Sequence, residues 1–142
     1  ETWPENAEFV MATKKTAPSK KRVLLVDDDL ELAQTYKELI EAHGYHVSTA
    51  PNGVLAIKHF LNHHLDAIVC DLKMPELEGD MFYAAVARIQ PGLHKRFIFI
   101  TGVADDPTFE VFIAKVKSPV LRKPVPIKKL LAEIKRVAGR AS

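Results

Sequence analysis

Polar residues follow four short apolar runs in this sequence, and their types indicate a possible chemistry. Aspartates at positions 27–29 follow "RVLLV", Asp71 follows "AIVC", Thr101 follows "FIFI" and Lys123 follows "VLR". Three adjacent carboxylates beside an apolar run repel one another and lose water, so a cation should compensate them. Carboxylate oxygens are ligands that suit Mg²⁺. A magnesium ion held there would also attract the oxygens of a phosphoryl group.

The apolar runs alternate with longer amphipathic stretches, and this happens five times from residue 22 onward. The runs predict strands at 22–27, 46–50, 66–71, 96–101 and 119–123. The stretches between and after them predict helices at about 30–43, 54–62, 79–90, 108–115 and 126–137. In the first helix Leu32, Tyr36, Leu39 and Ile40 should share the buried face, and Gly44 should end the helix.

Strands that are almost wholly apolar, separated by helices, indicate a parallel sheet covered on both faces. The sequence therefore predicts a single α/β domain, a flavodoxin-like (βα)5 fold with strand order 2-1-3-4-5. The carboxyl ends of parallel strands share one edge, where such folds bind ligands.

In this order the first and third strands are neighbours at about 4.8 Å. Asp27, Asp28 and Asp71 should therefore converge, and a lysine side chain of about 6 Å would let Lys123 reach toward them. Around Mg²⁺, Asp71 would act as a nucleophile that forms an aspartyl phosphate, while Thr101 and Lys123 meet the remaining phosphoryl charge.

Four signatures in this order, "LLVDDD", "DAIVCDLKMPELEG", "FIFITG" and "VLRKPV", resemble the receiver domain of two-component response regulators. The resemblance covers about residues 22–140. It implies that Asp71 is the phosphoacceptor and that Thr101 and Lys123 contact the phosphate. The metal ligands that it implies are Asp27, Asp28, Asp71 and the backbone carbonyl of Lys73.

The resemblance also implies how such a domain works. A phosphohistidine on a sensor histidine kinase or a phosphotransfer protein donates the phosphoryl group, and a downstream protein reads the surface of the fourth helix, fifth strand and fifth helix. The domain acts as a switch that catalyses its own phosphorylation and hydrolysis, not as a turnover enzyme. The family's lysine commonly precedes a cis proline, here Pro124.

Two positions depart from the family pattern. Val120 stands where the family usually has an aromatic residue that rotates on activation, and a β-branched side chain has no comparable swing. Phe109 and Phe112 on the fourth helix are candidates for side chains that move on activation instead. Gly102 replaces the common alanine and adds backbone freedom.

Three other functions compete with this interpretation. A haloacid-dehalogenase-type phosphatase also uses an aspartyl nucleophile and Mg²⁺, but its D-x-D pattern would have to be Asp27 and Asp29. A flavodoxin would place its phosphate loop where these aspartates repel phosphate. A pseudo-receiver would bind a partner without phosphorylation, yet the sequence retains the groups that phosphorylation requires.

Composition limits the remaining possibilities. The chain has 142 residues, and residues 23–142 carry as many acidic as basic side chains, so direct nucleic-acid binding is not expected. Without an apolar run near 20 residues or a signal peptide we expect no membrane association and a cytoplasmic location, and the single Cys70 suits a reducing compartment. Residues 1–21 should form a disordered tail, in which residues 1–10 are an artificial extension before a native start at Met11.

Other polar groups have structural interpretations. His59 and His63 have the spacing of a helical metal pair, but no further zinc ligand is apparent. One of the aspartates at 27–29 should cap the first helix, and Asp28 has Glu31 three residues on, as a capping box requires. The basic face of the fifth helix should be solvated. Its residues are Lys128, Lys129, Lys135 and Arg136.

Overall fold

A computed structural model describes residues 20–102 and 106–139 of the chain. The strands are β1 (Arg22–Val26), β2 (His46–Ala50), β3 (Ala67–Asp71), β4 (Phe97–Thr101) and β5 (Val120–Arg122). The helices are α2 (Leu30–Glu41), α3 (Gly53–Asn62), α4 (Gly79–Ile89), α5 (Pro107–Lys115) and α6 (Ile127–Ala138), with a short 3-10 helix η1 (Leu93–Arg96). The tail expected at 1–21 lies outside the described residues except for Lys20 and Lys21, which are exposed.

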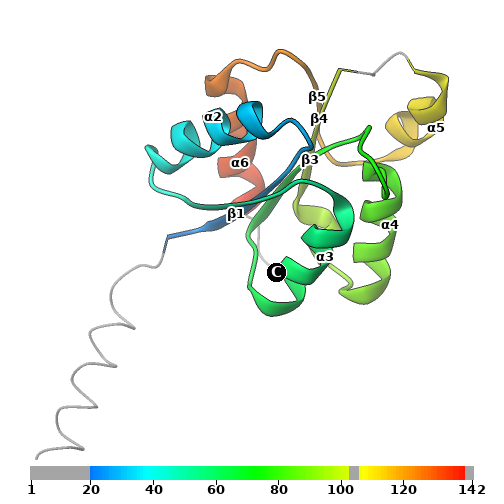
Figure 1. Cartoon of the computed structure of the whole chain (residues 1–142), viewed down its shortest axis with the longest axis horizontal. Helices are drawn as coiled ribbons and strands as arrows, with labels where there is room; N and C mark the ends of the chain where they lie inside the picture. The colour runs from blue at the N-terminus through cyan, green and yellow to red at the C-terminus, as the bar shows by residue number, and fades with distance from the viewer. Residues whose placement is uncertain (1–19, 103–105, 140–142) are drawn as a thin grey trace, which may run out of the picture.

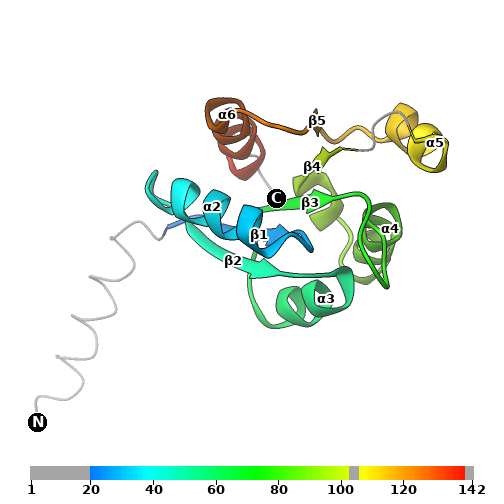
Figure 2. The same cartoon turned by 45° about the horizontal axis from the view of Figure 1, so that its top comes forward.

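The strands form one parallel five-stranded sheet in the order β2-β1-β3-β4-β5, as the sequence predicts (Figures 1 and 2). Val26 pairs with Cys70 and Asp71 pairs with Ile100 across the central strands. This register brings the last residues of β1, β3 and β4 to the same edge of the sheet.

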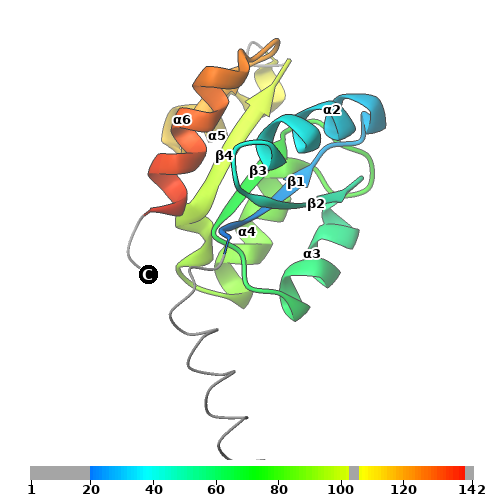
Figure 3. The ribbon, with the colours of Figure 1, turned by 90° about the vertical axis from the view of Figure 1, so that its left-hand side faces the viewer.

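Helices cover both faces of the sheet because successive strand residues point to opposite sides. Val23 and Leu25 belong to a core that includes side chains of α2 and α6, while Leu24 and Val26 belong to a second core that includes side chains of α3, α4 and α5. Figures 2 and 3 show these two helical layers on either side of the sheet. Among the described helices, none combines the length and apolarity needed to span a bilayer.

The first helix shows where the sequence prediction is right and where it is wrong. Gly44 follows the end of α2 with φ of 94°, a conformation that glycine adopts without steric cost, so it ends the helix as predicted. Tyr36 and Ile40 are buried, but Leu39 is exposed. Leu39 therefore does not share the buried face, because Ile40 takes the position that packs on the sheet.

A polar network lies at the amino ends of the strands, the edge of the sheet opposite to the aspartates, Thr101 and Lys123. Asp66 accepts a hydrogen bond from the backbone N–H of Arg22 over 2.8 Å, and His64 lies 3.0 Å from its other oxygen. Buried Arg96 donates to the carbonyls of Asp66 and Val137. These bonds tie the start of β3 to β1 and to the end of α6.

Gly79, the first residue of α4, lies against the backbone that carries Asp71. Its N–H donates to the carbonyl of Leu72 over 2.7 Å. A Cβ atom at this position would lie 2.4 Å from the carbonyl oxygen of Asp71 and 2.9 Å from Cα of Leu72. Only glycine lets α4 begin this close to the end of β3.

We predict that Gly79→Ala lowers the free energy of unfolding by about 2 kcal/mol, because backbone atoms must move to admit the methyl group. Gly102→Ala is the matched control, since a Cβ there would meet nothing within 4 Å. Urea denaturation measures both variants. Equal stability of the two variants would contradict the proposed close approach.

Candidate functional site

Three carboxylates meet at the carboxyl edge of the central strands. Asp27, Asp28 and Asp71 each offer an oxygen, and these oxygens lie within 4.8 Å of one another. Asp27 directly follows β1 and Asp71 ends the neighbouring β3, so the pairing of Val26 with Cys70 sets them side by side. Asp27 and Asp71 are buried, whereas Asp28 is exposed. The structure thus gathers the three acids that the sequence predicted would converge.

The third aspartate of the run has a different task. Asp29 is the N-cap of α2, and its side chain accepts a hydrogen bond from the N–H of Leu32 over 3.1 Å. Its own N–H donates to Oδ1 of Asp27 over 2.9 Å. One aspartate therefore caps the helix as expected, but the cap is Asp29, so the capping box suggested for Asp28 and Glu31 is wrong.

Lys123 supplies the positive charge facing these acids. Its Nζ lies 2.9 Å from Oδ2 of Asp71 and 3.2 Å from Oδ2 of Asp27. Its backbone N–H donates to the carbonyl of Thr101 over 2.8 Å, which positions the residue just after β5 against the end of β4. The peptide bond to Pro124 is cis, as the resemblance implied.

Burial and charge together set the protonation of this pair. Burial raises the pKa of Asp71, and the nearby Asp27 carboxylate raises it further. The hydrogen bond and the charge of Lys123 lower the pKa of Asp71, but they do not outweigh burial. The pKa of Asp71 therefore lies above that of an ordinary carboxyl group. Burial disfavours the ammonium of Lys123, but its bonds to Asp71 and Asp27 outweigh burial and raise its pKa. Lys123 therefore remains charged at neutral pH, and Asp71 gives up its proton less readily than an exposed aspartate.

The other two predicted residues, Thr101 and Lys73, belong to the end of β4 and to the loop after β3. Thr101 ends β4 and is fully buried. Lys73 lies in the loop between β3 and α4, two residues beyond Asp71, and its side chain is exposed. The same loop turns at Glu76, whose φ is 70°. No pattern in the sequence indicated a positive φ at this residue.

The donor set fits a hard divalent cation. In an octahedron with bonds of 2.0–2.1 Å, adjacent oxygens lie about 2.9 Å apart and opposite oxygens about 4.1 Å apart. Three carboxylate oxygens within 4.8 Å of one another could therefore share one ion after small side-chain movements. One of the three acids is exposed, which leaves a route for water ligands. Asp27, Asp28 and Asp71 are therefore the residues that could hold a metal.

Other candidates from the sequence lie elsewhere. The rings of His59 and His63 stack with centroids 4.3 Å apart, and Nδ1 of His63 lies 3.0 Å from the carbonyl of His59, so these side chains contact each other and their own helix. Cys70 is buried and unpaired, as expected of a core residue. Val120 is partly buried and packs against the core that includes α5. The basic residues of α6 are exposed, as expected. They are Lys128, Lys129, Lys135 and Arg136.

A five-stranded parallel sheet with an acidic cluster and a lysine at its carboxyl edge defines a class of protein, and comparison with known proteins agrees. The family model of the response regulator receiver domain matches residues 23–135. This chain belongs to the response regulator receiver domain family.

Individual relatives show the same similarity. The chain is 30% identical over 117 residues to the response regulator receiver protein CpdR of Brucella abortus, covering 82% of this chain and 96% of CpdR. It is 31% identical over 117 residues to the sensor kinase CckA of the same organism, covering 81% of this chain but only 12% of the kinase.

Solved structures resemble it as well. A CheY-like receiver domain protein from Methanospirillum hungatei superposes with a TM-score of 0.76 at 29% identity, covering 84% of this chain and 94% of that one. The receiver domain of the Francisella response regulator 1452 also gives a TM-score of 0.76, at 25% identity, covering 87% of this chain and all of that one.

The raised pKa of Asp71 leads to a prediction on stability. A carboxyl whose folded pKa lies above its unfolded value of about 3.9 stabilises the fold below that pH, and this contribution is lost as pH rises through the folded pKa. In EDTA, Asp71→Asn should therefore melt at a higher temperature than the wild type at pH 7. The difference should disappear near pH 3.5. A lower melting temperature of the variant at pH 7 would contradict the account.

Proposed function

We propose that this domain is a phosphorylation-dependent signalling switch in which Asp71 accepts a phosphoryl group from a phosphohistidine. The donor would be a sensor histidine kinase or a phosphotransfer protein. The observation that carries the proposal is the cluster itself: three carboxylates within 4.8 Å, two of them paired with Lys123. Membership of the receiver family supports it.

In the proposed reaction a carboxylate oxygen of Asp71 attacks the phosphorus atom of the donor. The new O–P bond forms as the N–P bond to the donor imidazole breaks, and the leaving imidazole keeps the electron pair and takes a proton from solvent. Lys123, 2.9 Å from Asp71, would hold its positive charge beside the phosphoryl oxygens. Later attack by water on phosphorus would break the same O–P bond and regenerate Asp71.

The site is proposed to take Mg²⁺ on Asp27, Asp28, Asp71 and the carbonyl of Lys73. When bound, the ion would supply positive charge to the carboxylates and to the phosphoryl oxygens. Asp28 is exposed and lies at the entrance of the cluster, so it is the ligand whose loss should disturb the fold least.

The proposed output begins with Thr101, whose hydroxyl would meet the phosphoryl group. A phosphoryl group brings up to two negative charges and three acceptor oxygens, which can draw this hydroxyl and the following segment inward. The segment leads into α5, where Phe109 is buried and Phe112 packs against the same core. The surface of α5, β5 and α6 would then change for a downstream protein, without an aromatic residue at Val120.

We propose residues 22–140 as the receiver unit, which the elements from β1 to α6 support. Its chemistry would be confined to phosphoryl transfer to, and hydrolysis from, its own Asp71. An aspartyl-phosphatase with sustained turnover is less well supported, because Asp29, the second residue of its required motif, caps α2. A cytoplasmic location is proposed because histidine-kinase phosphodonors act there.

The phosphoacceptor can be tested with acetyl phosphate and Mg²⁺, followed by intact mass spectrometry. The wild type should gain one phosphoryl group, and Asp71→Asn should gain none. Asp66→Asn is the matched control, because Asp66 is a buried aspartate at the opposite edge of the sheet and should leave labelling intact. Equal labelling of the wild type and Asp71→Asn would refute the assignment.

The metal site predicts a stability change that can be measured without phosphorylation. Mg²⁺ at ten times its dissociation constant should stabilise the wild type by about 1.4 kcal/mol, which raises the melting temperature by roughly 5 °C for a domain of this size. Asp28→Asn should lose most of this rise. Asp29→Asn should keep it, because asparagine caps a helix as well as aspartate does. An unchanged rise in Asp28→Asn would remove that residue from the site.

A further inference from the structure

The side chain of Tyr36 joins α2 to the segment that carries Lys123. Tyr36 is buried, and its hydroxyl donates a hydrogen bond to the backbone carbonyl of Val125 over 3.3 Å. Val125 is buried in the same core, which α2 and α6 share on one face of the sheet (Figure 2). The bond therefore connects the first helix of the domain to the connection between β5 and α6.

The same helix also holds one acid of the candidate site. Asp29 caps α2 by accepting a hydrogen bond from the N–H of Leu32, and its own N–H donates to Oδ1 of Asp27 over 2.9 Å. Tyr36 lies about two helical turns beyond this cap. The start of α2 thus orients the carboxylate of Asp27, while its middle contacts the backbone that follows Lys123.

The segment 123–125 is held at both ends by hydrogen bonds. At its start, the N–H of Lys123 donates to the carbonyl of Thr101 at the end of β4 over 2.8 Å. At its end, the carbonyl of Val125 accepts the bond from Tyr36. The segment belongs to neither β5 nor α6. These two bonds therefore help to set the position of the backbone from which the Lys123 side chain extends.

The position of that backbone matters because the Lys123 ammonium serves two acids at once. Its Nζ lies 2.9 Å from Oδ2 of Asp71 and 3.2 Å from Oδ2 of Asp27. A lysine side chain is long and flexible, so its head group keeps one place only when its backbone is fixed. A displacement of about 1 Å in a positioned group can slow a reaction by up to about a hundredfold.

We propose that Tyr36 is a positioning residue for the phosphoryl transfer to Asp71, because its hydroxyl holds the segment after β5 and so keeps the Lys123 ammonium between Asp71 and Asp27. The inference rests on the proposed function. The core itself needs only the aromatic ring, which phenylalanine would supply equally. A buried hydroxyl carries a desolvation cost that a hydrogen bond must offset, and here that bond is the one to Val125.

The rate of labelling by acetyl phosphate at saturating Mg²⁺ tests this role in Tyr36→Phe, which removes the hydroxyl alone. Labelling, followed by intact mass spectrometry well below the melting temperature, should be about fivefold or more slower than in the wild type. Tyr45→Phe is the matched control, because Tyr45 packs against the same core from the residue before β2. It should be labelled as fast as the wild type. An unchanged rate in Tyr36→Phe, or equal losses in both variants, would overturn the proposal.

Nuclear magnetic resonance of the Lys123 ammonium tests the same contact without phosphorylation. In ¹⁵N-labelled protein in EDTA, the signal is assigned by its absence in Lys123→Arg. Its protons should exchange with water about fivefold faster in Tyr36→Phe than in the wild type or Tyr45→Phe, since the ammonium leaves the carboxylates more often. Unchanged exchange would overturn the positioning role. A wild type that takes up no phosphoryl group would instead overturn the proposed function, and faster exchange in Tyr36→Phe would still show that Tyr36 places Lys123.

Discussion

The arrangement of this domain depends on keeping two buried carboxylates next to each other. Asp27 and Asp71 are forced together by the pairing of β1 with β3, and Lys123 offsets their repulsion from beyond β5. Removing Lys123 would be costly, because the two buried carboxylates would then be left without a compensating charge. The fold positions these charges without a ligand, so the repulsion between the Asp27 and Asp71 carboxylates is already present in the free protein.

The sequence predicted the sheet well because its apolar runs are short, continuous and bounded by polar residues. The predicted strand ends agree with the structure to within one residue, and the residues at or just beyond these ends form the acidic cluster. The misplaced Leu39 illustrates the limit of this reasoning. Both Leu39 and Ile40 fit a helical stripe that contains Tyr36, and only packing against the sheet decides which of them is buried.

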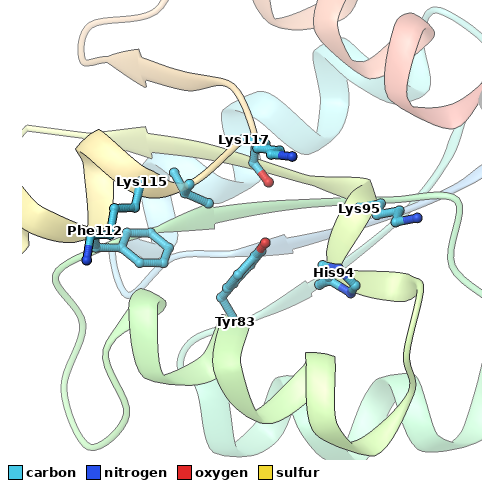
Figure 4. Close-up of a pocket in the computed structure, with 8 residues that line it drawn as sticks. Tyr83, His94, Lys95, Phe112, Lys115 and Lys117 are labelled. Atoms are coloured by element: carbon cyan, nitrogen blue, oxygen red, sulfur yellow. The ribbon is translucent and has the colours of Figure 1, made fainter.

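Features made by segments distant in sequence could not be predicted in the same way. The contact between Gly79 and the backbone of Asp71 depends on the path of the intervening loop. A cavity of about 670 Å³ with aromatic rings in its walls draws on α4, η1 and the end of α5, which share no motif (Figure 4). The hydrogen bonds of buried Arg96 to Asp66 and Val137 likewise need three elements in place at once. Spacing along the chain carries no signal for such assemblies.

The short edge strand has a consequence for the motions of the domain. β5 contains three residues and, among the strands that the structure describes, pairs only with β4, so few backbone bonds hold it. Lys123 follows it directly and attaches this weak edge to the centre of the sheet through side-chain charge. If the contacts of Lys123 with Asp27 and Asp71 weaken, β5 can unfold locally while the central strands stay paired. The proposed phosphorylation of Asp71 would therefore be detected as a change in amide protection along the outermost strand.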